Sequence, residues 1–284
     1  PMYFIAAACV VNIGLDFFFM GALRLGPAGA ALGTTLSQAV SVLLALCVIL
    51  KRKSIRLSKS DFCPRKATMK DILSIGLPVA AQDGFIQVSF MLITIMANQR
   101  GLTDAAAVGI VEKIISFLFL VPSSMLSTVS ALGAQNIGAG KYDRTDDILR
   151  YAIAIGVGFG AVMALLMQFI APSMVRPFTS DEAVVLAGAA YIRSYIFDCL
   201  FAGIQFSFSG YFCAWGRSGL SFLHNTLSIL LVRVPGAWLA CRFFPQTLVP
   251  MGLAPACGSL FSSIVCVLLY RWMKSQNKPT GNKD

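Results

Sequence analysis

Apolar residues fill most of the chain in eight long blocks, separated by short connections that carry glycine, proline or charged residues. A helix rises about 1.5 Å per residue, so about 20 apolar residues cross the hydrocarbon layer of a bilayer. Each block reaches that length. The pattern therefore predicts an all-α, polytopic membrane helix bundle with eight transmembrane helices, at residues 2–22, 27–50, 72–98, 104–133, 149–171, 186–212, 220–242 and 252–273.

The composition supports a membrane environment. Hydrophobic residues make up 57% of the 284 residues and charged residues only 13%, whereas soluble domains carry about 25% charged residues. So few polar side chains cannot cover a water-exposed surface, and so many apolar residues exclude a disordered chain. The composition therefore excludes a soluble globular protein and places most of the chain in lipid.

Basic residues concentrate in one connection. The net charge is +10, and eight of the 23 Lys and Arg residues lie between residues 51 and 70. Such a cluster between apolar spans is typical of a cytoplasmic loop and not of a nucleic-acid-binding face. With this loop in the cytoplasm, the opposite side receives only Arg24, Arg100, Arg176 and Arg242. We expect a multi-pass protein of the cell membrane, a bacterial inner membrane, with a cytoplasmic C-terminus and no nucleic-acid partner.

Polar residues form a stripe along the third span. Asp83, Gln87, Thr94 and Asn98 recur at helical spacing among apolar neighbours, so they share one face of the helix. Gln and Asn suit a helix–helix interface held by amide hydrogen bonds. A carboxylate inside a span instead indicates a functional site. Both interpretations stay open for Gln87, and Asp83 favours the functional one.

The sixth span repeats this arrangement, with Asp198 and Gln205 on one face and aromatic residues nearby. A carboxylate and ring faces both attract positive charge, which predicts a cavity for a lipophilic cation. The alternative is that the rings face lipid and that Asp198 pairs with a neighbouring arginine.

Three further charged residues lie within spans. Glu112 and Lys113 are adjacent, and adjacent positions do not face each other on a helix. Each therefore needs its own partner, in an ion pair with another span or in a relay. Arg233 lies beside Pro235, where the broken ladder frees a carbonyl, and we interpret it as structural or cavity-lining.

The sequence contains no motif of a serine hydrolase, a zinc protease or a phosphate-binding loop. We therefore expect neither an enzyme nor a bound metal or organic cofactor. An ion gradient would have to supply the energy for any transport, and acids within the membrane suit the reversible binding of H⁺ or Na⁺.

Four segments carry a family resemblance: ALGAQNIGAGKYDR at 131–144, NIGLDFFFMGALRLGPAGAALGTTLSQ at 12–38, SIGLPVAAQ at 74–82 and LLVRVPGAW at 230–238. The first resembles a helix end of the multidrug and toxic compound extrusion (MATE) family. The others resemble, in turn, the junction of the family's fifth and sixth helices, the start of its seventh helix and its eleventh helix. They occur in the family's order and extend over nearly the whole chain.

The resemblance implies helices five to twelve of a two-lobed, twelve-helix transporter. Residues 1–50 would be the last two helices of the N-terminal lobe, 51–71 a basic cytoplasmic linker, 72–273 a six-helix C-terminal lobe and 274–284 a cytoplasmic tail. Helices one to four would come from the same or another chain. The resemblance further implies export of small, cationic, lipophilic drugs in exchange for H⁺ or Na⁺ by alternating access, in contact with membrane lipid.

On this interpretation, the cavity of the second lobe is lined by the polar residues named above, Asp83, Gln87, Thr94, Asn98, Asp198 and Gln205. Asp16, at the end of the fifth helix, is interpreted as structural. Two alternatives remain open. One is a flippase for lipid-linked oligosaccharides with a related fold, which would need an arginine-rich cavity. The other is a non-transporting, truncated membrane component.

Overall fold

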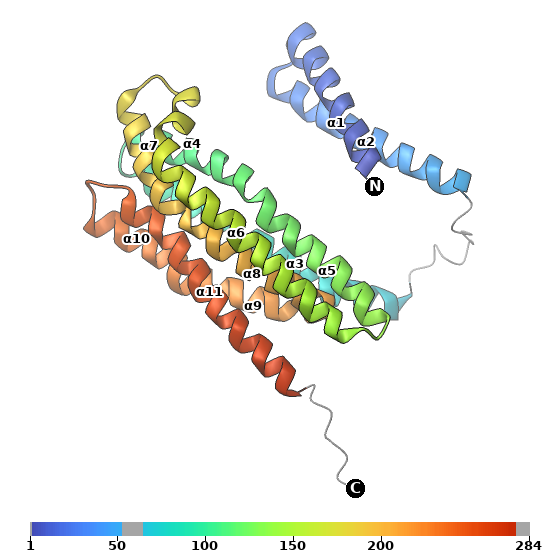
Figure 1. The fold of residues 1–284 in the computed structure, drawn as a ribbon. Coiled ribbons are helices and arrows are strands. Elements are labelled where there is room, and N and C mark those ends of the chain that lie inside the picture. The colour runs from blue at the N-terminus through green and yellow to red at the C-terminus, as the bar shows by residue number, and fades with distance from the viewer. Residues whose placement is uncertain (1, 53–64, 277–284) are drawn as a thin grey trace. The chain divides into compact units, whose positions relative to one another are not determined.

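The computed structural model describes residues 2–52 and 65–276, which form long helices (Figure 1). Among these residues, eight helical segments are long and apolar enough to cross a membrane, and no strand occurs. The prediction of an all-α bundle with eight membrane-spanning helices is confirmed. The chain divides into two compact units, residues 1–66 and 67–284, which are described separately.

The first unit is a helical hairpin. Helix α1, Met2–Asp16, continues into a π-helical turn, Phe17–Ala22, and α2, Gly26–Arg52, packs against both. The reversal places Arg24 and Gly26 at positive φ angles of 52° and 56°, which glycine adopts without the steric cost that a side chain brings. These helices match the first two predicted spans.

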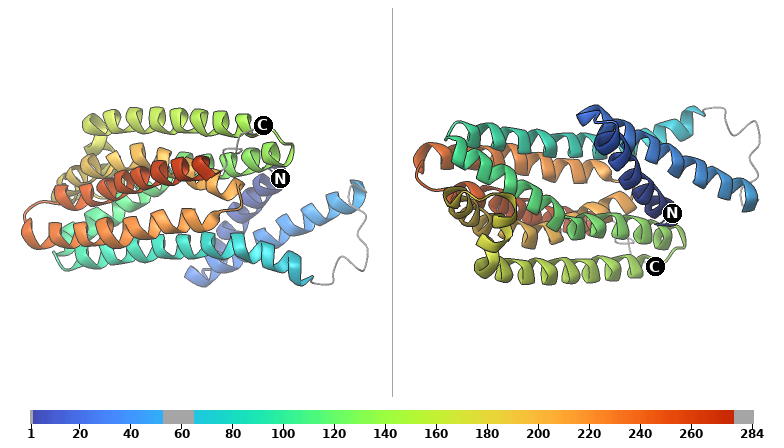
Figure 2. Two further views of the ribbon diagram at one scale, coloured as in Figure 1. Left: turned by 90° about the horizontal axis from the view of Figure 1, so that it is seen from below. Right: turned by 90° about the horizontal axis from the view of Figure 1, so that it is seen from above.

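The second unit contains six membrane-crossing segments, of which three are interrupted (Figures 1 and 2). Helices α3, α6 and α11 are continuous, whereas α4–α5, α7–α8 and α9–α10 are interrupted pairs. Their bounds are α3 Lys66–Asn98, α4 Leu102–Leu118, α5 Leu120–Gly138, α6 Tyr142–Val175 with a short 3₁₀ turn at Arg176–Phe178, α7 Glu182–Tyr195, α8 Phe197–Ala214, α9 Ser218–Ser228, the π-helical turn Ile229–Arg233, α10 Val234–Phe243 and α11 Val249–Gln276.

The helices extend beyond several predicted boundaries. Because α2 continues to Arg52 and α3 begins at Lys66, both ends of the predicted linker 51–71 are helical. Residues 53–64 of that linker lie outside the described part of the chain. Helix α11 likewise continues to Gln276, and the rest of the predicted tail, residues 277–284, also lies outside it.

Proline accounts for two of the three interruptions. Pro122 lies three residues after the break at Phe119, and Pro235 follows the π-helical turn. A proline cannot donate the helical hydrogen bond, and its ring displaces a carbonyl of the preceding turn. Neither proline nor glycine marks the third break, at Ile196. Interrupted helices inside a membrane protein typically line a polar site, because the freed backbone groups need partners.

Helix α8 is packed on several sides, whereas α3 is packed on one. Helix α8 contacts α5, α6 and α11, and a Cβ added to Gly156 of α6 would lie 2.8 Å from the Cα of Gly203 of α8. Small residues allow this close approach of backbones. Helix α3 runs parallel to α9 and α10 (Figure 2) and is joined to α9 and to the π-helical turn through side chains such as Phe85 with Phe222 and Phe90 with Arg233.

Candidate functional site

The interruptions bring polar side chains of the second unit together. Asp198 lies in the first turn of α8, just after the break at Ile196, and Arg233 is the last residue of the π-helical turn before α10. The side chains form what we call the buried polar cluster, made of Thr94, Glu112, Tyr195, Asp198, Gln205, Arg233 and Ser259. Five helical segments contribute to it besides the π-helical turn: α3, α4, α7, α8 and α11.

Asp198 is the most buried carboxylate of this cluster. Its side chain is 0% exposed, and neither carboxyl oxygen has a hydrogen-bond partner among the described residues. The polar groups that act on it are the guanidinium of Arg233 and the hydroxyl of Ser259. Burying an ionised carboxylate without a donor is costly. Both oxygens of Asp198 are therefore available as ligands for a proton or a small cation.

Gln205 lies two helical turns after Asp198 on the same face of α8 and adds polar groups to the buried polar cluster. Its Nε2 donates to the Ser259 hydroxyl at 2.9 Å, while its Oε1 is buried without a donor in the described part of the chain. An amide oxygen is a further ligand for a hard cation. The prediction that Asp198 and Gln205 share a face is confirmed, and that face is buried.

Arg233 joins three elements of the cluster. Its Nη2 donates to the Tyr195 hydroxyl at 2.8 Å, and its guanidinium carbon lies 4.7 Å from the centre of the Phe90 ring. The residue is only 8% exposed, and its Nε has no partner in the described ranges. Arg233 therefore fixes the π-helical turn against α7 and α3, consistent with its interpretation as structural.

Glu112 reaches the cluster through Thr94. The Thr94 hydroxyl lies 3.2 and 3.1 Å from the two Glu112 carboxyl oxygens, and 3.0 Å from the carbonyl of Phe90. Lys113 is exposed on the other side of α4. Neither Glu112 nor Lys113 forms an ion pair with a described residue, so their predicted role in an ion pair or relay stays a prediction.

The polar stripe of α3 points away from this packing. Asp83, Gln87 and Asn98 are exposed, and only Thr94 of the stripe reaches the cluster. The face of α3 that packs into the unit carries Gln82, Ser89, Ile93 and Ala97 instead. The structure therefore divides the six predicted site residues into two sets, Thr94, Asp198 and Gln205 in the buried polar cluster and Asp83, Gln87 and Asn98 on an open face.

Several polar residues with partners were not among the predicted site residues. Gln82 accepts a hydrogen bond from Ser221 at 2.7 Å, and His224 lies between Ser209 and Ser262, at 3.0 and 2.7 Å. They join α3, α8, α9 and α11. His224 is the single histidine of the chain, while the serines around it also fit ordinary helix packing.

The first unit holds a separate polar pair. Oδ1 of Asp16 and Nδ2 of Asn12 are buried without a partner in the described residues. A Cβ added to Gly33 of α2 would clash with the Asp16 carboxyl, so the glycine makes room for it. Asp16 also lines a cavity of about 460 Å³ with Ile13 and Phe17. The interpretation of Asp16 as structural stays a prediction.

Comparisons with known proteins agree with this geometry. Residues 78–239 match the MatE family. The probable multidrug resistance protein YpnP of Bacillus subtilis is 28% identical over 275 residues, which cover 96% of this chain and 60% of that protein. The multidrug export protein MepA of Staphylococcus haemolyticus is 26% identical over 208 residues, which cover 73% of this chain and 46% of that protein.

Solved structures show the same fold. A mutant of the Vibrio cholerae MATE transporter VcmN superposes with a TM-score of 0.88 at 18% identity, covering 97% of this chain and 62% of that one. A MOP superfamily transporter from Pyrococcus furiosus gives a TM-score of 0.89 at 21% identity, covering 98% and 63%. The chain thus spans about 60% of the length of these proteins. Since the family match covers more than half of its residues, the chain belongs to the MatE family of multi-pass membrane transporters.

Proposed function

We propose that the protein is a secondary active multidrug exporter that exchanges organic cations for H⁺ or Na⁺ by alternating access. The family, and relatives named for multidrug resistance and multidrug export, support this proposal. The single observation that carries it is Asp198, a fully buried carboxylate without a hydrogen-bond partner in the described residues, at the break between α7 and α8.

In this proposal the coupling ion binds in the buried polar cluster. Asp198 supplies the charge, and the carbonyl of Gln205 and the hydroxyl of Ser259 supply neutral oxygens. Arg233, held by Tyr195, opposes a second positive charge at the same place. A cation would therefore bind weakly enough to leave again, which an exchange cycle requires.

The organic cation binds at the open face of α3. Asp83 provides a carboxylate there, Gln87 and Asn98 provide amides, and Met91 is 60% exposed beside them. The polarisable thioether of Met91 suits lipophilic cations of different shapes. Thr94 links this face to Glu112, so a substrate on α3 lies one hydrogen bond from the buried polar cluster.

The remaining parts of the assembly follow from the comparison of lengths. The relatives extend beyond the part that this chain spans, and we propose that four further helices, from the same or another chain, complete the transport cleft. The protein would lie in the bacterial inner membrane with its C-terminus in the cytoplasm. It would need no organic cofactor, resident metal or nucleic acid.

An efflux experiment tests this proposal. Asp83→Asn, in the protein expressed from its complete reading frame, should reduce ion-driven export of a cationic dye about ten- to a hundredfold, because a charge-assisted contact is worth about 1.5–3 kcal/mol. Asp147→Asn is the matched control, since Asp147 is an exposed acid paired only with Arg150 at the surface. Both variants should insert into the membrane like the wild type.

Two results would contradict the proposal. Wild-type export by Asp83→Asn would remove α3 from the substrate path. Export of an anionic, lipid-linked sugar in place of the cationic dye would favour the flippase, which shares the fold but not the charge of the substrate.

A further inference from the structure

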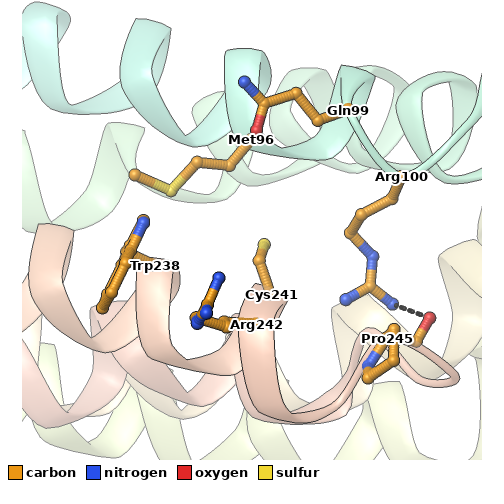
Figure 3. Close-up of a pocket in the computed structure, with 7 residues that line it drawn as sticks. All are labelled: Met96, Gln99, Arg100, Trp238, Cys241, Arg242 and Pro245. Carbon is orange, nitrogen blue, oxygen red and sulfur yellow. Dashed lines mark hydrogen bonds between the residues drawn. The ribbon is translucent and has the colours of Figure 1, made fainter.

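A second cavity lies at the C-terminal end of α3. It has a volume of about 430 Å³ and is formed by the last turns of α3 and α10 (Figure 3). Gln99 and Arg100 project into it from the end of α3, and Trp238 and Arg242 from α10, with Met96 and Cys241 as apolar walls. This volume lies within the range of about 300–1,000 Å³ that small-molecule sites occupy.

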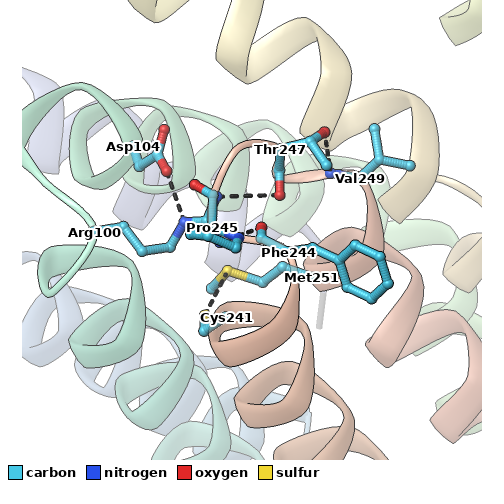
Figure 4. Close-up of polar contacts among 8 residues, drawn as sticks. All are labelled: Arg100, Asp104, Cys241, Phe244, Pro245, Thr247, Val249 and Met251. Atoms are coloured by element: carbon cyan, nitrogen blue, oxygen red, sulfur yellow. Dashed lines mark hydrogen bonds and ion pairs between the residues drawn. The ribbon is translucent and has the colours of Figure 1, made fainter.

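Arg100 lines this cavity, but its donors are already bonded to protein groups. Its Nη1 donates to the Phe244 carbonyl at 3.0 Å, its Nη2 donates to the carbonyls of Pro245 and Thr247 at 2.9 and 3.1 Å, and its Nε pairs with Asp104 at 2.7 Å (Figure 4). Its side chain is 6% exposed. These contacts fix the loop between α10 and α11 and leave Arg100 with little capacity for another ligand.

Three other donors of the cavity are free. The Arg242 guanidinium, the Gln99 amide and the Trp238 indole N–H make no hydrogen bond or ion pair with any described side chain or backbone group. Arg242 and Gln99 are exposed, and Trp238 is 51% exposed. No carboxylate lines the cavity, because Asp104 is turned to Arg100. The site therefore presents positive charge and donors, and it would repel an organic cation.

The cavity lies at the ends of two segments that are long and apolar enough to cross a membrane. Helix α10 ends at Phe243, and Phe243 and Phe244 are 66% and 54% exposed. Aromatic residues and arginine at helix ends are typical of the headgroup layer of a bilayer. Exposed Ile95 and Leu239, on the same helices, lie toward the membrane interior and offer an apolar surface to acyl chains.

We propose that this cavity binds the phosphodiester headgroup of a membrane phospholipid and that it prefers a net anionic headgroup. The phosphate oxygens accept hydrogen bonds from Arg242, Gln99 and Trp238, and the acyl chains follow α3 and α10 into the bilayer. Arginine is suited to this role because its planar donors match two phosphate oxygens at once. The lipid would bridge the ends of α3 and α10. This inference does not depend on whether the protein exports drugs.

Native mass spectrometry of the purified full chain, titrated with phosphatidylglycerol, tests this inference. Arg242→Gln should weaken binding of phosphatidylglycerol about tenfold, and Trp238→Phe, which removes only the N–H donor, about threefold. Arg176→Gln is the matched control, because Arg176 is an exposed arginine outside the cavity that pairs with Glu182 at 3.1 Å. It should bind phosphatidylglycerol like the wild type. Phosphatidylcholine should bind several-fold more weakly than phosphatidylglycerol.

Each other outcome overturns the inference. If Arg242→Gln and Arg176→Gln lose the same affinity for phosphatidylglycerol, the effect comes from the net charge of the protein and not from the cavity. If Arg242→Gln binds phosphatidylglycerol like the wild type, the cavity is not the lipid site. Displacement of the lipid by millimolar inorganic phosphate would make the site one for free phosphate. Because Arg242 has no partner in the described residues, its substitution should leave the melting temperature without lipid unchanged, which separates lost binding from lost folding.

Discussion

Asp83 and Asp198 occur in similar surroundings in the sequence and in opposite surroundings in the structure. Each is an acid in an apolar span, followed by a glutamine on the same helix face. Asp83 is exposed on the uncovered side of α3, whereas Asp198 is 0% exposed beneath the break between α7 and α8. An open carboxylate can meet a ligand of any shape, while a buried one admits only a proton or a small ion.

The difference comes from how the two helices are packed. Helix α8 has neighbours on several sides, so its polar face has to turn into the protein. Helix α3 is held by α9 and the π-helical turn through residues such as Gln82 and Phe90, and by α4 through Thr94. Asp83 takes no part in these contacts. A polar stripe therefore indicates that its residues share one face of a helix. It does not indicate whether that face is buried in the protein or exposed at its surface.

The largest effect on stability should come from Arg233. Arg233→Gln removes the hydrogen bond to Tyr195 and the contact with the Phe90 ring. A charged hydrogen bond and a desolvated cation–π contact are together worth about 3.5–5 kcal/mol. We expect a clear fall in the melting temperature of the detergent-solubilised protein. A melting temperature equal to that of the wild type would show that Arg233 does not hold the buried polar cluster together.

A smaller effect should follow from Ser221→Ala. It leaves the buried carbonyl of Gln82 without the donor that now lies 2.7 Å away, which costs about 1–2 kcal/mol. The same thermal melts measure it. A double variant that also carries Gln82→Leu should recover most of the loss, because neither partner is then left unsatisfied. No recovery would contradict the pairing of α3 with α9.

Thr94→Val should cost about 1 kcal/mol, since Glu112 loses its hydroxyl donor in a half-buried position. Thr94→Ser keeps the hydroxyl and is the control for shape. The thermal melts should rank the valine variant below the serine variant, and the reverse order would exclude the hydrogen bond as the cause.

The smallest effect on stability should come from the open face of α3. Asp83→Asn and Gln87→Ala should each change the unfolding free energy by less than about 0.5 kcal/mol, as exposed substitutions without partners usually do. Their effect should instead fall on dye export. A marked fall in melting temperature for either variant would mean that this face packs against protein and is not open to substrate.

Much of the fold could be predicted, because the length of the apolar segments determines the membrane-spanning helices. The eight spans follow from about 20 apolar residues each, and proline accounts for the breaks near Pro122 and Pro235. The break at Ile196 could not be predicted, because no proline or glycine lies near it. That break places Asp198 at the start of α8. The sequence around Ile196 therefore does not indicate the break on which the candidate site depends.

The grouping of site residues shows the same limit. Periodicity placed Asp198 with Gln205 and Asp83 with Gln87 correctly on shared faces. It did not reveal that Arg233 contacts Tyr195 or that Thr94 reaches Glu112, because these pairs depend on how separate helices pack. The missing donor of Asp16 and the close approach of Gly33 are likewise visible only in three dimensions.

Ion coupling through Asp198 can be measured most directly in proteoliposomes that contain the protein from its complete reading frame. Uptake of a cationic dye is followed with an H⁺ or Na⁺ gradient, and exchange of labelled for unlabelled dye is followed without one. Asp198→Asn should lose gradient-driven uptake and keep exchange, while Asp83→Asn should keep the gradient dependence and lose dye affinity. Gradient-driven uptake by Asp198→Asn at the wild-type rate would contradict the assignment of the coupling ion to the buried polar cluster.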